Sequence, residues 1–283
     1  MSEFKSIGES LGTGLSEPSL TSKVETQTCP DCGQRFQAQI FYRGEVEVKL
    51  PTAICPACRR KQQELKEIER AQKDLERIRE DQEDSWYAEY GVPGIFMEKT
   101  FENFQRQLQP KAFEAVKGYK EKSLVLLSPN LYGVGKTHLV CALANDLAGN
   151  SEKATLVPSS HLIRRHRCPV LFITEPKLLA RIRRTFNKDA EESDEEVYQK
   201  LNRYPLLIID DVGKVRPRDF SFLQGVYFQI LDDRYNEGLP IILTTNLDFA
   251  ELEAHIGGAC ADRLHEMCGK DGFVKMLGKS FRH

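Results

Sequence analysis

A glycine-rich loop followed by a lysine and a threonine lies near the middle of the chain. Residues 124–138 read LVLLSPNLYGVGKTH: a short apolar run, the loop, and the start of an amphipathic helix. Glycines let backbone N–H groups approach phosphate oxygens closely, and the N-terminus of the helix adds partial positive charge. Lys136 supplies an ammonium group for the outer phosphates, and the Thr137 hydroxyl is placed to coordinate Mg²⁺. The pattern predicts a site for a nucleoside triphosphate with Mg²⁺.

One position departs from the G-x-x-x-x-G-K-[ST] pattern of such loops. Asn130 stands where the first glycine is expected, and asparagine is the non-glycine residue that best tolerates a left-handed backbone. We therefore interpret the loop as altered but usable; the alternative is a chance match in a surface loop. The predicted nucleotide-contacting residues are Asn130, Tyr132, Gly133, Val134, Gly135, Lys136, Thr137 and His138, together with Asp210.

An acidic pair follows a second apolar run. Residues 205–211 read PLLIIDD, and four consecutive aliphatic residues suit a strand that is buried on both faces of a parallel sheet. At the carboxyl end of this strand Asp210 would hold Mg²⁺ together with Thr137, and Asp211 could orient the attacking water. The alternative is an acidic pair that ends a strand only for solubility.

Four of the eight cysteines form two C-x-x-C pairs, Cys29 with Cys32 and Cys55 with Cys58. Two such pairs supply the four thiolates that a tetrahedral Zn²⁺ site requires. The spacing predicts a zinc ribbon in which residues 36–50 form a hairpin. A redox dithiol pair or unbound thiols are the alternatives. The other four cysteines lack ligand spacing and are interpreted as buried thiols: Cys141, Cys168, Cys260 and Cys268.

Composition limits the functional classes. The chain carries 40 Lys and Arg against 42 Asp and Glu, so any binding to nucleic acid must come from local patches. No apolar run is long enough to cross a bilayer, and the first residues lack the apolar region of a signal peptide. We therefore expect a cytoplasmic protein with no membrane partner.

The elements that must position these side chains alternate along the chain. Apolar runs predict strands at residues 123–128, 169–174, 205–211, 239–245 and 272–277, and helical patterns separate them at residues 136–148, 175–186 and 220–235. Such alternation is typical of an α/β fold with a five-stranded parallel sheet covered by helices. Ligands bind outside the carboxyl ends of the strands of such a sheet, where both motifs lie.

The expected organisation has four parts: a disordered tail (1–25), a zinc-ribbon module (26–60), a charged helical linker (61–89) and a nucleotide-binding domain (90–283). The tail is rich in polar residues and cannot bury enough surface to fold alone. Within the linker a narrow apolar stripe could instead mark a coiled-coil or partner-binding segment.

From about residue 90 onward the chain resembles the AAA+ ATPases of the DnaC and IstB group, which comprises helicase loaders and transposition helper ATPases. The likeness rests on six segments in order: TFENF (100–104), GVGKTH (133–138), LLIIDD (206–211), TTN (244–246), DRL (262–264) and GKSFR (278–282). The resemblance implies a P-loop NTPase core that uses ATP and Mg²⁺ and has no C-terminal lid, since the chain ends one residue after Arg282.

The resemblance also implies further site residues. Asn246 matches the polar sensor of the family, Arg263 the arginine finger that one subunit inserts into its neighbour, and Arg282 the second sensor. The alternatives are a strand-ending asparagine, a helix-surface arginine paired with Asp262 or Glu266, and a solvated terminus. The predicted catalytic set is therefore Lys136, Asp210, Asp211, Asn246, Arg263 and Arg282.

Two basic clusters, residues 164–167 and 181–184, remain. The second suggests phosphate contacts with single-stranded DNA, and a solvated helix face is the alternative. The leading hypothesis is a helicase loader that binds a replicative helicase, contacts single-stranded DNA and forms a homo-oligomer when ATP is bound. The alternatives are a transposition helper with a transposase as partner, or an adaptor that binds ATP without hydrolysis.

Overall fold

The computed structural model describes residues 20–43, 45–48, 53–157, 160, 162–216 and 220–281. The chain divides into two compact units, Met1–Lys73 and Asp74–His283. The division falls inside the long helix α1 (Pro56–Glu89). Each unit is described separately.

The first unit contains a small antiparallel sheet of three strands in the order β1-β2-β3. The hairpin predicted within residues 36–50 is present as β2 (Arg35–Arg43) and β3 (Val46–Val48). Strand β1 (Leu20–Thr28) pairs along the whole of β2, so residues 20–25, which the sequence analysis assigned to the tail, belong to this strand. The rest of the predicted tail lies outside the described residues.

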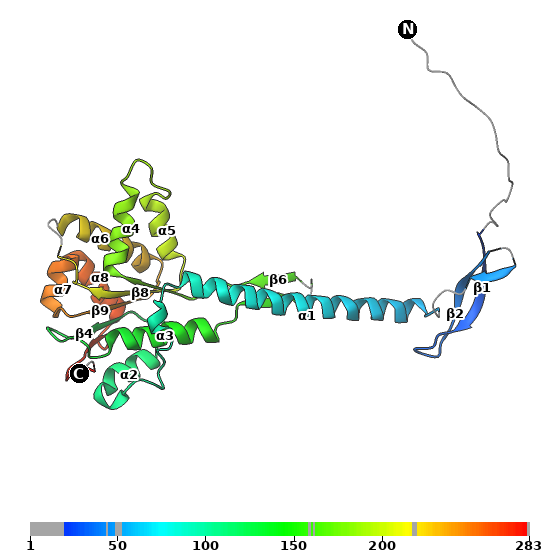
Figure 1. The fold of residues 1–283 in the computed structure, drawn as a ribbon, viewed down its shortest axis with the longest axis horizontal. Helices are drawn as coiled ribbons and strands as arrows, with labels where there is room; N and C mark the ends of the chain where they lie inside the picture. The colour runs from blue at the N-terminus through cyan, green and yellow to red at the C-terminus, as the bar shows by residue number, and fades with distance from the viewer. Residues whose placement is uncertain are drawn as a thin grey trace, which may run out of the picture. The chain divides into compact units, whose positions relative to one another are not determined.

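The second unit is built on a five-stranded parallel sheet in the order β10-β4-β9-β8-β7. Each of the five predicted strands is present: β4 (Leu124–Leu127), β7 (Val170–Thr174), β8 (Leu206–Val212), β9 (Ile241–Thr245) and β10 (Phe273–Lys275). Helices cover both faces of the sheet (Figure 1). The predicted α/β class is therefore confirmed.

The three helices predicted between the strands are α3 (Lys136–Asn150), α4 (Glu175–Thr185) and α6 (Phe220–Asn236), and the predicted helical linker lies within α1. Helices that were not predicted are α2 (Pro110–Lys117), α5 (Asp194–Asn202), α7 (Phe249–Ile256), α8 (Gly258–Cys268) and the 3₁₀ turns η1 (Gly94–Phe96) and η2 (Arg106–Leu108). Capping boxes begin two of them, through Ser193 with Glu196 in α5 and Asp248 with Glu251 in α7. Each box satisfies N–H groups that the first helical turn leaves unpaired.

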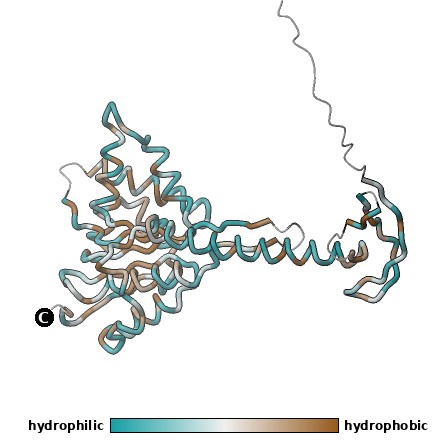
Figure 2. Tube along the Cα trace, turned by 45° about the vertical axis from the view of Figure 1, so that its right-hand side comes forward, coloured by the Kyte–Doolittle hydropathy of each residue, from teal (hydrophilic) through white to brown (hydrophobic). Residues whose placement is uncertain are grey.

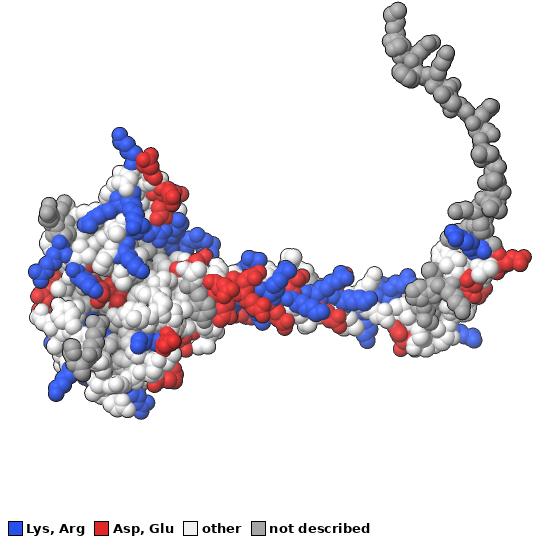
Figure 3. All heavy atoms as spheres, in the orientation of Figure 1, with Lys and Arg blue, Asp and Glu red and all other residues white. Residues whose placement is uncertain are grey.

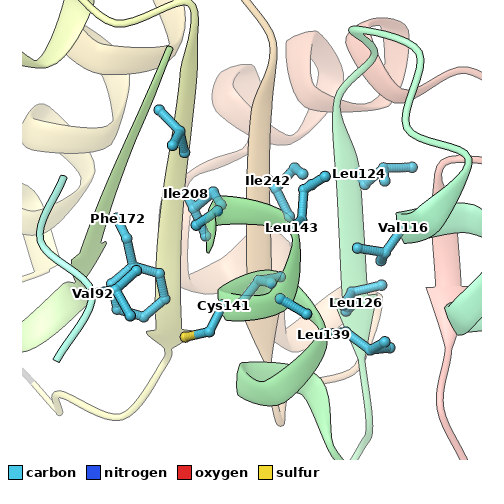
Figure 4. Close-up of a cluster of buried hydrophobic side chains, with 14 of the residues drawn as sticks. Val92, Val116, Leu124, Leu126, Leu139, Cys141, Leu143, Phe172, Ile208 and Ile242 are labelled. Carbon is cyan, nitrogen blue, oxygen red and sulfur yellow. The ribbon is translucent and has the colours of Figure 1, made fainter. Parts of the chain in front are cut away.

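The sheet separates two apolar cores because successive side chains of a strand point to opposite faces. On one face Leu126, Ile208 and Ile242 pack against α3 through Leu139 and Leu143 (Figure 4). On the other face the alternate residues of the same strands pack against α4, α6, α7 and α8. The apolar stretches of the trace accordingly gather in the middle of this unit (Figure 2).

The segment between α3 and β7 forms a two-stranded hairpin of β5 (Ala154–Val157) and β6 (Leu162–Arg165). The C-terminal part of α1 is bound to it: Arg79 Nε donates to the Ala154 carbonyl at 3.1 Å, and Gln82 Nε2 donates to the His166 carbonyl at 3.2 Å. Trp86 and Tyr90, at and just beyond the end of α1, are buried in the core that α3 covers.

A glycine joins the end of α1 to the sheet. Gly91 has a φ of +81°, and a Cβ atom there would lie 2.1 Å from the carbonyl oxygen of Phe172 on β7. The close approach is needed because the Phe172 N–H donates to the Tyr90 carbonyl at 2.7 Å.

Gly91→Ala should therefore lower the free energy of unfolding by about 2 kcal/mol or more, since both the left-handed backbone and the clash with a carbonyl oppose it. Urea denaturation would measure the change. Gly149→Ala is the matched control because a Cβ there meets no atom within 4 Å, and alanine is the better helix former. Equal stability of the two variants would contradict the argument.

Candidate metal centre and nucleotide site

The four cysteines of the two C-x-x-C pairs meet in the first unit. The sulfur atoms of Cys29, Cys32, Cys55 and Cys58 all lie within 4.8 Å of one another, and those of Cys32 and Cys55 are 3.6 Å apart. A tetrahedral zinc site with Zn–S bonds of about 2.3 Å separates its sulfurs by about 3.8 Å. The cluster thus fits Zn²⁺ in size, number and type of ligand, as a zinc ribbon requires.

Local backbone structure prepares these sulfurs as ligands. Gly33, with a φ of +71°, closes the first turn by donating to the Cys29 carbonyl at 2.9 Å. The second pair lies at the start of α1, where the helix N-terminus favours thiolates. A hydrogen bond from the Cys55 N–H to the Cys29 sulfur, 3.4 Å long, is the main cause that lowers the pKa of Cys29 to about 6. This hydrogen bond favours the thiolate form of Cys29, which is the form that binds a metal.

The predicted phosphate loop connects β4 to α3. Asn130 has a φ of +55°, which is the left-handed backbone expected of the residue that replaces the first glycine. Its N–H donates to the Asn246 carbonyl at 3.0 Å, so the start of the loop is attached to the end of β9. Gly133 and Gly135 have φ values of +73° and +94°. Val134 between them is buried, whereas Tyr132 is 69% exposed.

Aromatic side chains support this loop. A Cβ atom at Gly135 would lie 2.7 Å from Phe104 and 2.8 Å from Phe281. The Phe281 N–H donates to the Gly133 carbonyl at 2.8 Å. His138 makes an edge contact with the ring of Phe104 and a 3.0 Å hydrogen bond with the Thr100 carbonyl, and burial lowers its pKa. The TFENF segment (100–104) therefore packs against the phosphate loop.

Lys136 joins three elements at the carboxyl edge of the sheet. Its ammonium group donates to Ser128 Oγ after β4 and, at 2.5 Å, to Asn246 Oδ1 after β9. Lys136 itself begins α3 and is only 7% exposed. The structure thus brings together the two residues that the sequence analysis named as phosphate ligand and sensor.

Asp210 lies beside Thr137. The Thr137 hydroxyl is 3.1 Å and 3.0 Å from the two carboxylate oxygens of Asp210, and the Thr244 hydroxyl donates to Oδ1 at 2.5 Å. Burial raises the pKa of Asp210 to about 6, with a smaller contribution from the charge of Asp211, while the hydroxyls oppose the shift. Hydroxyl and carboxylate oxygens are the hard ligands that Mg²⁺ takes alongside phosphates. These two residues fit a magnesium site.

Asp211 is held differently from Asp210. It has a φ of +61°, and the pairing of β8 with β9 is irregular between Ile209 and Val212. Its N–H donates to Thr244 Oγ1 at 3.0 Å, and its carboxylate forms a 2.8 Å ion pair with the exposed Lys214. Asp211 therefore turns out of the strand, and its carboxylate lies near solvent.

The sequence analysis missed Glu175, whose side chain is fully buried at the start of α4. Its carboxylate accepts from Tyr227 Oη at 2.7 Å and from the N–H of Gly213 at 3.0 Å, and it pairs with His255 Nε2 at 2.8 Å. Gly213 follows β8 directly, so Glu175 fixes the backbone next to Asp210 and Asp211. The only signal in the sequence was an acidic residue directly after a predicted strand.

Arg263 is not placed at the phosphate loop. Its guanidinium forms a 2.5 Å ion pair with Asp232 and lies over the ring of Phe228, both on α6. The alternative partners Asp262 and Glu266 do not hold it, and Glu266 accepts from Tyr235 instead. Among the described residues, Nη1 of Arg263 is buried without a hydrogen-bond partner. The predicted second sensor, Arg282, lies outside the described residues.

The basic cluster of α4 is partly neutralised. Arg181 forms a two-pronged ion pair with Glu192, at 2.7 Å and 2.8 Å, and Lys200 binds the same carboxylate. The hydrogen bonds from Arg181, which have the largest effect, and from Lys200 lower the pKa of Glu192 to about 2. Side chains of both signs are visible over α4 and α5 (Figure 3). No helix within the described ranges could span a membrane.

Comparison with known proteins agrees with this geometry. Residues 95–283 match the family model of the IstB-like ATP binding protein. A replicative helicase loader DnaC from Buchnera aphidicola subsp. Baizongia pistaciae is 25% identical over 181 residues, which cover 62% of this chain and 66% of that protein. The chain thus aligns with just under two thirds of that relative's length.

Two further likenesses were found, one to a sequence and one to a solved structure. The ATP-dependent Clp protease ATP-binding subunit ClpC of Staphylococcus epidermidis is 28% identical over 174 residues, which cover 56% of this chain and 20% of that protein. A crystal structure of the DnaC helicase loader superposes with a TM-score of 0.50 at 18% identity, covering 65% of this chain and all of that one. The latter shows a shared AAA+ fold.

Cys32→Ser should reduce the zinc content of the purified chain and loosen the first unit, because one of four thiolates is lost and metal binding is coupled to folding in such modules. Zinc per chain would be measured by elemental mass spectrometry. Cys141→Ser, which alters a buried cysteine of α3, is the matched control and should keep its zinc. Unchanged zinc content in Cys32→Ser would refute the metal centre.

Asp210→Asn should stabilise the nucleotide-free protein at pH 8 by about 1–3 kcal/mol. The folded-state pKa of about 6 exceeds the ordinary value of 3.8, so burying the charged carboxylate opposes folding increasingly as the pH rises above 3.8, and the full cost is present above pH 6. As the pH falls from 7 towards 4, the folded wild type takes up a proton and the advantage of the variant shrinks. Denaturation at several pH values would measure this. Asp211→Asn, at a partly exposed position, should show much less of the effect.

Proposed function

This chain belongs to the IstB-like ATP-binding protein family, and from that membership we propose that it is an ATPase that loads a replicative helicase onto single-stranded DNA. The observation that carries the enzymatic part is the convergence of Lys136 with Asn246 and of Thr137 with Asp210 at one edge of the sheet. A triphosphate and its Mg²⁺ need a cation, a sensor and hard oxygen ligands in this arrangement.

Each side chain has a part in this proposal. Backbone N–H groups of the loop and Lys136 bind the β- and γ-phosphates of ATP, and Thr137 and Asp210 hold Mg²⁺, which neutralises developing charge when bound. When ATP is bound, Asn246 gives up its hydrogen bond with Lys136 and contacts a phosphate oxygen or the attacking water. In this way it orients the nucleophile. Asp211 supports that water once its carboxylate leaves Lys214.

Arg263 acts between subunits in this proposal. Its guanidinium is bound to Asp232 within its own chain, so we place its catalytic role in an ATP-bound homo-oligomer, where a neighbouring nucleotide competes for it. A planar cation suits the charge that develops on the equatorial oxygens of the γ-phosphate. The second sensor, Arg282, is proposed on the family pattern alone.

The helicase partner is proposed from two features. The Buchnera relative carries the name of a replicative helicase loader, and this chain adds an N-terminal four-cysteine module to the family core. We propose the zinc ribbon (26–60) as the helicase-binding module, joined by the helical linker (61–89) to the ATPase domain (90–283). Single-stranded DNA would contact the exposed cations of α4.

One alternative has its own supporting observation. The ion pair between Asp211 and Lys214, 2.8 Å long, occupies the carboxylate that would support the water, which favours an adaptor that binds ATP without turnover. A transposition helper with a transposase partner is the other alternative, since the matched family model is named for IstB.

The test measures ATP binding and turnover with and without single-stranded DNA. Lys136→Ala should lose tight nucleotide binding. Arg263→Ala should keep nucleotide affinity and lose roughly 10³-fold in turnover, the scale of finger residues in related chemistry. Lys270→Ala, an exposed cation near the end of α8, is the control.

Two results would overturn parts of the proposal. Wild-type protein that binds ATP without any turnover supports the adaptor, and an oligomer of Arg263→Ala that hydrolyses normally refutes the finger. Co-purification with a hexameric replicative helicase, against a transposase as competitor, distinguishes the loader from the transposition helper.

A further inference from the structure

A cavity of about 410 Å³ lies in the second unit, away from the phosphate loop. Its walls come from the C-terminal part of α1, the segment after β6, β7, α4, and the end of α5. No residue of the loop, β8 or β9 lines it. The volume is within the range of small-molecule sites, about 300–1,000 Å³.

Cations dominate the charged lining. Arg167, Arg181, Lys200 and Arg203 line the cavity, and Glu89 is the only acidic residue among its lining residues. Arg181 and Lys200 are bound to Glu192. Within the described residues neither Arg167 nor Arg203 forms an ion pair or a side-chain hydrogen bond. The cavity therefore has two guanidinium groups available to an anion.

One residue of the lining, Gln82, carries an acceptor that lacks a donor among the residues described. Gln82 Nε2 donates to the His166 carbonyl at 3.2 Å, which fixes the orientation of the amide. In the described part of the chain, Gln82 Oε1 is buried and has no hydrogen-bond donor. A buried carbonyl without a donor costs free energy. A ligand whose N–H or O–H group reaches this oxygen, as the lining side chains shift, would remove this cost.

We propose that this cavity binds a phosphorylated small molecule of nucleotide size. Two guanidinium groups suit a phosphate, because each can donate two parallel hydrogen bonds to it. Tyr204, half-buried in the wall, offers an aromatic ring to a planar group. Gln82 Oε1 accepts from a donor of the same ligand. The proposal stands on the cavity and does not depend on ATP hydrolysis.

Trp86 provides a direct readout, since it lines the cavity and is the single tryptophan of the chain. AMP is the nucleotide probe and inorganic phosphate the simple anion. Titrations use the full zinc-loaded chain in the Lys136→Ala background, so that the phosphate loop contributes little. AMP should change Trp86 fluorescence saturably, and inorganic phosphate should compete with AMP only at higher concentrations.

Arg167→Ala and Arg203→Ala should each raise the dissociation constant of AMP about tenfold or more, the scale of one charge-assisted hydrogen bond. Gln82→Met, which keeps the length of the side chain and loses the acceptor, should weaken AMP and leave phosphate unchanged. Arg165→Ala is the matched control, because Arg165 is exposed on β6 and does not line the cavity.

The proposal is overturned if AMP gives no saturable signal, or if the signal survives both arginine substitutions. A signal that appears in wild type and disappears in Lys136→Ala belongs to the phosphate loop and also overturns it. If only a single-stranded oligonucleotide gives an arginine-dependent signal, the cavity is part of a DNA surface and not a small-molecule site. Circular dichroism of each variant verifies that the fold is intact.

Discussion

The burial of one carboxylate constrains the nucleotide site. Asp210 is 2% exposed near the end of strand β8, yet two hydroxyl groups, from α3 and β9, stabilise its charge. A buried charge is costly unless it is paired or bonded, so Asp210 and its neighbours depend on one another. Thr137 is positioned by the loop that leads from β4 into α3, and Thr244 lies near the end of β9. The parallel pairing of β4 with β9 and of β9 with β8 brings these residues to the same edge of the sheet.

Glu175 extends this dependence to the helices. Its buried carboxylate binds the backbone that follows β8 and the side chains of Tyr227 on α6 and His255 on α7. Burial and the neighbouring carboxylate raise the pKa of Tyr227, which keeps the phenol protonated as a donor. Since α6 also carries Asp232, the partner of Arg263, a shift of the segment after β8 would also act on the helix that binds Arg263.

The parts that could be predicted from the sequence are those set by local pattern. Four aliphatic residues before Asp210 predicted a buried strand, and the loop residues up to Thr137 carried their chemistry in their spacing. The partners of Glu175 and Arg263 could not be predicted from the sequence. Each partner lies at least 30 residues away along the chain, and the side chains meet only when the helices pack. Strand β1 escaped prediction for a similar reason: its polar sequence is ordered by pairing with β2.

The paired state of Lys136 indicates how binding could be transmitted. Its ammonium group donates to the hydroxyl of Ser128 and to the amide oxygen of Asn246, and both are neutral oxygens. A phosphate is a stronger acceptor because it is charged, so a triphosphate in the loop would displace these contacts. Asn246 would then be released from the lysine while its carbonyl still accepts from Asn130. The same exchange that would bind a phosphate would therefore free the Asn246 side chain without detaching the end of β9 from the loop.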